Sequence, residues 1–148
     1  MSDDSLRIVG LTLQLQVAQA VLAQCQEQKR TTQAQLDDVR SFAASYGQAH
    51  ARMEQDLSRR GHSLAKAGTS GGLKMTAGLH QGLSAFQSRG EAHLATMAEN
   101  IRTVSRVQSD LEDDMVAHAK QERRYQDEVD ELKRKIRDAQ TQQEASYV

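Results

Sequence analysis

The chain has 148 residues, a formal net charge of −1, no proline and no tryptophan, and only 3% of its residues are aromatic. Large aromatic side chains supply much of the burial in an ordinary globular core, so this composition argues against such a core. It fits long helices that pack along a narrow seam. The mean hydropathy of −0.68 would also suit a disordered chain, but the near-neutral charge and a regular apolar period argue against disorder.

Cys25 is the only cysteine, which excludes an internal disulfide and a zinc site built from several cysteines, and favours a reducing compartment. Two acidic residues near the start argue against a secretory signal. We also expect no membrane span, because Gln14, Gln16 and Gln19 interrupt the apolar run that follows. The sequence therefore predicts a cytoplasmic protein.

A first helix is predicted over about residues 5–65, with Asp3, Asp4 and Ser5 as candidate N-cap residues. Steps of three and four residues trace a mostly apolar seam along it, which is typical of a coiled coil. The seam positions are Ile8, Leu11, Leu15, Ala18, Leu22, Cys25, Lys29, Thr32, Leu36, Val39, Ala43, Tyr46, His50, Met53, Leu57, Arg60 and Leu64. Leu11 to Val17 also alternates with a period of two, but the seam passes through it unbroken, so a strand is rejected.

Three glycines crowd together only within Lys66–Gly72, which predicts a turn over about residues 66–73 and a second helix over about 74–144. The second seam comprises Leu94, Met97, Ile101, Val104, Gln108, Leu111, Met115, His118, Glu122, Tyr125, Val129, Leu132, Ile136 and Ala139. Leu79, Leu83, Phe86 and Gly90 extend it backwards with two successive four-residue steps, a stutter that unwinds a supercoil locally. We therefore expect an all-α, antiparallel two-helix coiled-coil hairpin that forms a single domain over residues 1–148.

A fold at residue 70 pairs positions whose numbers add to about 140, which places Thr32 opposite Gln108. Polar residues at seam positions commonly fix the register of a coiled coil. Charge is unevenly spread along the chain. Basic residues outnumber acidic ones between His50 and Gly90, and acidic residues outnumber basic ones between Arg106 and Leu132.

A second apolar row lies near the N-terminus and consists of Val9, Leu13, Val17 and Val21, four residues apart. A single partner helix covers one stripe of a helix, so we expect this row to be open to water. Two interpretations remain open. The row either broadens the seam or mediates self-association, or it docks another protein.

No motif predicts catalysis. Gly68 to Lys74 resembles a phosphate-binding loop only faintly, because Leu73 separates the glycine from the lysine and no strand precedes it. Asp114, His118 and Glu122 share one helical face, but a bundle metal site needs ligands that converge from several helices. Nucleic-acid binding is disfavoured because aromatic residues do not interleave the basic stretch. We expect no catalytic residue, no metal and no cofactor.

The chain resembles the small stalk proteins of type III secretion systems, the flagellar FliJ and injectisome YscO/HrpO family. The resemblance covers almost the full length. It lies in the two-helix architecture and in a Gln/Arg/Leu-rich texture, seen in Tyr46-Gly47-Gln48-Ala49-His50 and Gln121-Glu122-Arg123-Arg124-Tyr125. The resemblance implies a non-enzymatic stalk or coupling protein, in the cytoplasm or peripheral at the inner membrane.

The resemblance also implies partners. The terminal end of the hairpin would bind the secretion ATPase hexamer through Val9, Leu13, Val17, Val21, Val129, Leu132 and Ile136. A patch nearer the turn would bind the cytoplasmic domain of the export-gate membrane protein through Tyr46, His50, Leu79, Leu83 and Phe86. Substrate chaperones are further expected partners, whereas nucleic acid and direct membrane insertion are not. The alternative is a general helical adaptor or chaperone that self-associates through its apolar row.

Overall fold

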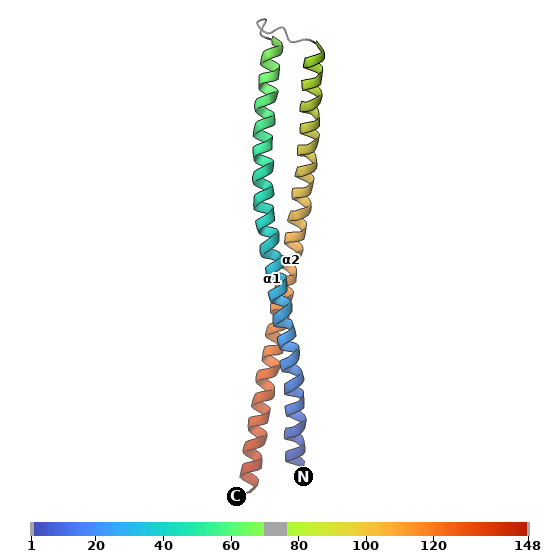
Figure 1. The fold of residues 1–148 in the computed structure, drawn as a ribbon. Coiled ribbons are helices and arrows are strands. Elements are labelled where there is room, and N and C mark those ends of the chain that lie inside the picture. The colour runs from blue at the N-terminus through green and yellow to red at the C-terminus, as the bar shows by residue number, and fades with distance from the viewer. Residues whose placement is uncertain (1, 70–76, 148) are drawn as a thin grey trace. The chain divides into compact units, whose positions relative to one another are not determined.

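The computed structural model describes residues 2–69 and 77–147, which form two long helices (Figure 1). Helix α1 is Asp3–Thr69 and helix α2 is Ala77–Ser146, and they pair antiparallel, with no strand in the two described ranges. The predicted fold class, an all-α two-helix coiled-coil hairpin, is confirmed.

The helix ends differ from the predicted ones by a few residues. The first helix begins at Asp3 rather than Ser5, and its N-cap is Ser2 rather than any of the predicted residues. The Ser2 hydroxyl accepts a hydrogen bond from the Ser5 backbone N–H (3.3 Å), which is the usual contact between an N-cap and the third helical residue. Of the predicted turn, residues 66–69 belong to α1, and residues 70–73 lie outside the described residues.

Packing divides the chain into two compact units, which are described separately. The terminal unit comprises Met1–Leu36 and Asp110–Val148, and the middle unit comprises Asp37–Ser109. The core of the terminal unit is a cluster of Ala18, Leu22, Val129 and Leu132, flanked by the partly buried Leu11, Leu15 and Tyr125. Because two helices can bury only one stripe each, this core is thin.

Lys29 and Gln143 each make a polar contact that joins the helices of the terminal unit. The Lys29 ammonium lies 3.0 Å from a carboxylate oxygen of Glu122, and both side chains are partly buried. Near the helix ends, the Gln143 side-chain amide donates a hydrogen bond to the Ser5 hydroxyl (2.9 Å). Two of the polar breaks in the seams, Lys29 and Glu122, are therefore partners.

The predicted seam describes most of the packing. In α1, every seam residue is buried or half-buried except Arg60, which is exposed, and Gly61 takes the inward position instead. In α2, the seam holds without exception from Leu94 to Ala139. The heptad pattern therefore found the contact stripe of both helices over most of their length.

Upstream of Gly90, which faces inward as predicted, the predicted seam is wrong. Leu79, Leu83 and Phe86 are exposed, whereas Ser84 and Gln87 are half-buried together with Gly90. The predicted stutter, which needed Phe86 on the inner side, is therefore absent from this part of α2.

Two glycines explain why Gln87, and not Phe86, faces the other helix in the middle unit. The Gln87 side-chain amide donates a hydrogen bond to the Leu57 carbonyl oxygen (2.7 Å), and it would lie 3.0 Å from a Cβ at Gly61. In the other direction, Leu57 Cδ2 would lie only 2.6 Å from a Cβ at Gly90. A glycine on each helix thus makes room for a side chain from the other.

The observed register also differs from the predicted one. Cross-helix contacts join Ser5 to Gln143 and Lys29 to Glu122 in the terminal unit. In the middle unit, the Asn100 amide donates a hydrogen bond to the Tyr46 hydroxyl (3.0 Å). In each pair the residue numbers add to more than 140, so the predicted sum of about 140 is wrong within both units.

Candidate partner-binding surfaces

The terminal unit exposes a row of large apolar side chains on α1. Leu6, Val9, Leu13 and Val17 have exposed fractions of 56%, 48%, 58% and 65%. Such exposure is unusual for Leu and Val, which are among the residues most often buried in a protein core. We call these four residues the apolar row. Three of them are predicted binding residues, and Leu6 adds a fourth that the sequence reasoning did not include.

The row runs diagonally around the outer side of α1. A step of four residues turns about 40° beyond a full turn of an α-helix, whereas the seam alternates steps of three and four and keeps facing α2. Val21, the last predicted member, has therefore rotated to the edge of the interface and is half-buried. Together with Tyr125 of α2, Leu13, Val17 and Val21 line an open hollow of about 360 Å³.

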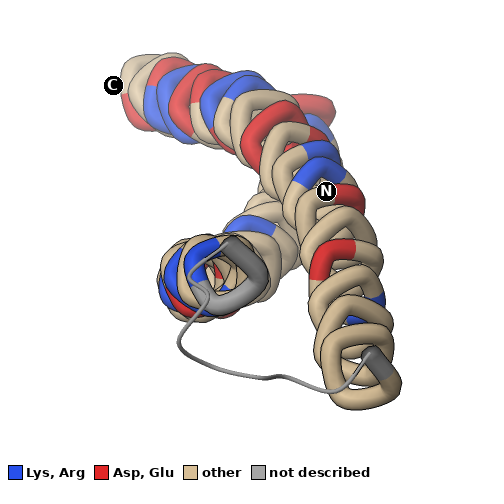
Figure 2. Tube along the Cα trace, turned by 90° about the horizontal axis from the view of Figure 1, so that it is seen from above, with Lys and Arg blue, Asp and Glu red and all other residues tan. Residues whose placement is uncertain are grey.

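The stretch of α1 that carries Val9, Leu13 and Val17 is uncharged. No charged residue occurs between Arg7 and Glu27. By contrast, the C-terminal part of α2 mixes Lys and Arg with Asp and Glu (Figure 2). The apolar row therefore lies on a glutamine-rich stretch of α1 without charges, bordered by Arg7 at one end and by Glu128 of α2 at the edge of the hollow.

By length and composition alone, α1 passes a test for a membrane-crossing helix. Its most apolar 18-residue window has a mean hydropathy of 1.4, and 11% of that window is buried. The glutamines therefore do not exclude a span by composition, contrary to the sequence prediction. A core helix or a signal sequence passes the same test, so the observation is weak evidence for a membrane.

The predicted binding residues on α2 are not exposed beside the apolar row. Val129 and Leu132 are only 2% and 7% exposed and belong to the core of the terminal unit, while Ile136 is half-buried. A partner cannot reach Val129 or Leu132 while the two helices stay paired. Their apolar character is explained by packing against Ala18 and Leu22.

The five predicted binding residues of the middle unit divide into two groups. Tyr46 and His50 are half-buried and already have partners. Tyr46 stacks on Phe42 with ring centroids 5.4 Å apart, and His50 Nδ1 lies 3.9 Å from a Glu54 carboxylate oxygen. Leu79, Leu83 and Phe86 are exposed.

Leu83 and Phe86 line a groove that runs between the two helices of the middle unit. The groove consists of two adjoining hollows of about 750 Å³ and 570 Å³, which share Arg60 and Phe86. Its apolar lining comes from Ala49, Met53, Leu57, Leu64, Leu83 and Phe86. Its basic lining comes from Arg52, Arg59, Arg60 and Arg89. We call this feature the arginine groove.

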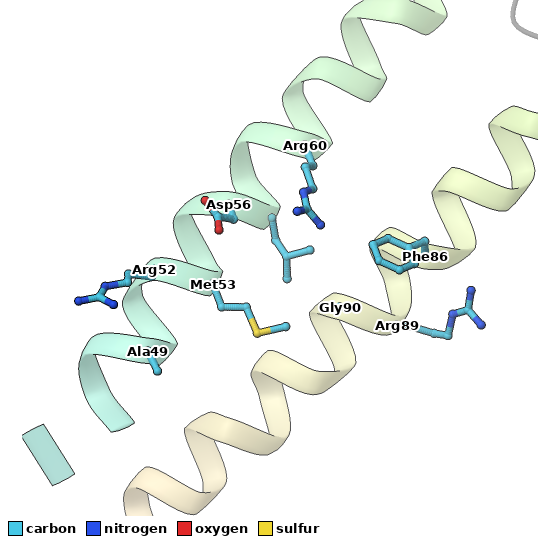
Figure 3. A pocket seen from close by; sticks show the side chains of 9 residues that line it. Ala49, Arg52, Met53, Asp56, Arg60, Phe86, Arg89 and Gly90 are labelled. Carbon is cyan, nitrogen blue, oxygen red and sulfur yellow. The ribbon is translucent and has the colours of Figure 1, made fainter. Parts of the chain in front are cut away.

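Figure 3 shows how the cations are placed around the larger hollow. Arg60 points into the space between the helices, while Arg52 and Arg89 extend outward at opposite edges. The sequence showed that this region is basic but not that it is hollowed. The usable signal was Gly90, whose missing side chain lets Leu57 reach α2 and leaves Phe86 outside the interface.

The residues that the sequence offered as metal ligands do not form a site in the structure. The Glu122 carboxylate is paired with Lys29, and Asp114 is exposed. Within residues 2–69 and 77–147, no three His, Cys, Asp or Glu side chains are grouped so that they could hold a metal ion. Cys25 is buried. Most of the phosphate-loop candidate, residues 70–74, lies outside the described residues.

Comparisons with models of protein families, with curated proteins and with solved structures found no match to this chain.

Proposed function

We propose that this chain is a non-enzymatic stalk or coupling protein of a bacterial type III secretion apparatus, and that it binds its partners through exposed side chains on a helical hairpin. The observation that carries the proposal is the apolar row. Leu6, Val9, Leu13 and Val17 are about half exposed or more, although large apolar residues normally lie inside. An exposed apolar surface of this kind marks an interaction site.

The helices also suit a coupling role. Helix α1 is one uninterrupted helix of 67 residues, and the chain has no proline that would kink it. A long unkinked helix transmits a displacement along its axis because its backbone hydrogen bonds resist bending. We assign the secretion ATPase hexamer to the apolar row, and the export gate and substrate chaperones to the middle unit, on the strength of the family resemblance.

The test uses the purified hairpin and a type III secretion ATPase from the same organism. We expect the hairpin to promote assembly of the ATPase ring and to raise its ATP turnover, and a Val9→Asp/Leu13→Asp variant to lose both effects. An aspartate in an apolar interface either becomes buried without a partner for its charge or keeps water in the interface, and both outcomes weaken binding. Gln16→Asp is the matched control, since Gln16 is exposed on the same helix outside the row.

Circular dichroism should show that all three proteins are equally helical, because the substituted side chains are exposed. An ATPase whose assembly and turnover do not respond to the wild-type hairpin would contradict the proposal. So would an ATPase that responds equally to the wild-type protein and to the double Asp variant.

The alternative is a helical adaptor that self-associates through the apolar row, and the absence of charged residues on α1 between Arg7 and Glu27 favours it. In a symmetric dimer each patch meets a copy of itself, so a patch without charges avoids like-charge repulsion. Sedimentation velocity distinguishes the two. A stable dimer that Val9→Asp/Leu13→Asp dissociates favours self-association, and a monomer that binds the ATPase favours the stalk.

A further inference from the structure

We propose that the arginine groove of the middle unit is a docking site for an acidic amphipathic helix of a partner protein. The groove lies wholly within Asp37–Ser109. The proposal therefore stands or falls separately from the role assigned to the apolar row in the terminal unit.

The shape of the groove fits a helix. Its two hollows share residues and extend along α1 from Ala49 to Leu64. At 1.5 Å per residue this is about 22 Å, or roughly four turns of a bound helix. Amphipathic helices bind such apolar grooves through side chains spaced three and four residues apart.

The lining of the groove supplies the apolar contacts. Phe86 and Leu83 are 54% and 41% exposed, so their surface is available to an incoming side chain. Met53 lies deeper, and its unbranched side chain can adapt to the shape of different apolar anchors. The floor between them is formed by Leu57, which packs over Gly90. An occupant therefore needs a row of aliphatic or aromatic side chains.

The arginines specify the charge of the occupant. In the described ranges, none of Arg52, Arg59, Arg60 and Arg89 forms an ion pair. Asp56 is the only acidic residue that lines either hollow in this part of the chain. Planar guanidinium groups bind carboxylates with two parallel hydrogen bonds, which suits Glu and Asp residues at the flanks of a bound helix. The groove is thus complementary to a helix with an apolar face and acidic borders.

Nucleic acid would also be attracted to four arginines, but single strands are held mainly by aromatic side chains on which successive bases stack. Phe86 is the only aromatic residue that lines either hollow in the described part of the chain. A protein helix fits the combination of an apolar floor and a basic rim better.

The probe is a synthetic 18-residue helical peptide with leucines at alternating steps of three and four and glutamates on both flanks. Its control carries lysine in place of each glutamate. Fluorescence anisotropy of the labelled peptide, titrated with the full-length hairpin, measures Kd at low and high salt. We expect the acidic peptide to bind at least about ten times more tightly than the lysine peptide, with an affinity that falls as salt screens the ion pairs.

Variants of the hairpin locate the site. Arg60→Gln/Arg89→Gln should weaken binding of the acidic peptide about ten-fold, since exposed ion pairs contribute a few-fold each. Phe86→Ala should weaken it by a similar factor through loss of the apolar contact. The matched control is Arg30→Gln/Arg134→Gln, which removes the same charge from exposed positions in the terminal unit and should change Kd less than two-fold.

Four results would overturn the proposal. Two concern the peptides: equal binding of the acidic and lysine peptides, or unchanged binding of the acidic peptide by the groove variants. The other two would identify a different occupant of the groove. One of these is displacement of the peptide by a single-stranded oligonucleotide at equal concentration, which would identify nucleic acid as the occupant. The other is dimerisation of the hairpin in sedimentation velocity that is lost when Arg60 is replaced, which would identify a second copy of the chain as the occupant. The substituted residues are exposed, so helicity should be the same in all variants.

Discussion

Gly90 should be intolerant of alanine, although it lies in the interior of a long helix. In a helix interior, alanine is more stable than glycine by about 1 kcal/mol. At Gly90, however, the added Cβ would lie 2.6 Å from Leu57 Cδ2 and 3.0 Å from Leu57 Cδ1. Carbon atoms normally approach to about 3.5–4.0 Å, so Leu57 or the helix backbone must move.

The magnitude follows from the two opposing terms. Overpacking a filled site costs about 1–3 kcal/mol. Offset by the gain in helix propensity, Gly90→Ala should destabilise the protein by about 1 kcal/mol. Leu57 is 5% exposed, so moving its side chain away from Gly90 would give up part of the packing that buries it.

The matched control is Gly82→Ala, eight residues earlier on the same helix. A Cβ at Gly82 would meet nothing within 4 Å, so this variant should gain about 0.5–1 kcal/mol from helix propensity alone. The measurement is urea-induced unfolding followed by circular dichroism at 222 nm. The two variants should differ by about 2 kcal/mol, in opposite directions from the wild-type protein.

A double variant tests whether Leu57 is the cause. Leu57→Ala alone should cost about 2–5 kcal/mol. In that background Gly90→Ala should become neutral or stabilising, because the clashing methyl groups are gone and the new one fills part of the cavity. If Gly90→Ala stabilises the wild-type protein as much as Gly82→Ala does, the contact between Leu57 and Gly90 is not tight and the reasoning fails.

Three further changes should have measurable effects on unfolding. Gln87→Ala removes the hydrogen bond to the Leu57 carbonyl oxygen and should cost about 0.5–1.5 kcal/mol in urea unfolding, whereas Gln81→Ala, at an exposed position, should be neutral. Leu132→Ala should cost about 2–5 kcal/mol, but Leu13→Ala less than about 0.5 kcal/mol, which a thermal melt of each variant would resolve. Lys29→Leu should cost about 1 kcal/mol by leaving Glu122 without its cation, and Lys29→Leu/Glu122→Leu should recover that loss, as a double-mutant cycle completed with Glu122→Leu would show in urea unfolding.

The fold could be predicted because it depends on a repeated pattern. Large apolar residues at steps of three and four fixed the inner face of both helices from Leu94 onward in α2 and over nearly all of α1. The absence of proline allowed each helix to continue unbroken. Periodicity averages over many residues, so single polar exceptions such as Lys29 did not disturb the prediction.

The register and the groove depend instead on individual contacts. The pairing of Lys29 with Glu122 is a choice among several polar seam residues, and the sequence alone favoured Thr32 with Gln108. At the groove, the pattern assigned Phe86 to the inner face because it is apolar. The inner position belongs to Gln87, since Gly61 leaves its amide room to reach a backbone carbonyl of α1. A rule that scores hydrophobicity cannot detect such a fit.

The division of side chains between core and surface supports a binding role. Several positions in the thin core are filled by small residues such as Ala18, Cys25 and Ala139, and no large side chain in the described ranges is completely buried. The same helices leave larger apolar residues, including Leu13, Val17 and Phe86, mostly open to water. Burial of an aliphatic or aromatic side chain stabilises a protein by about 1.5–3 kcal/mol, so these residues contribute little to stability where they stand. Their exposure is explained if the free energy of burying them is released on binding, at the apolar row by one partner and at the arginine groove by another.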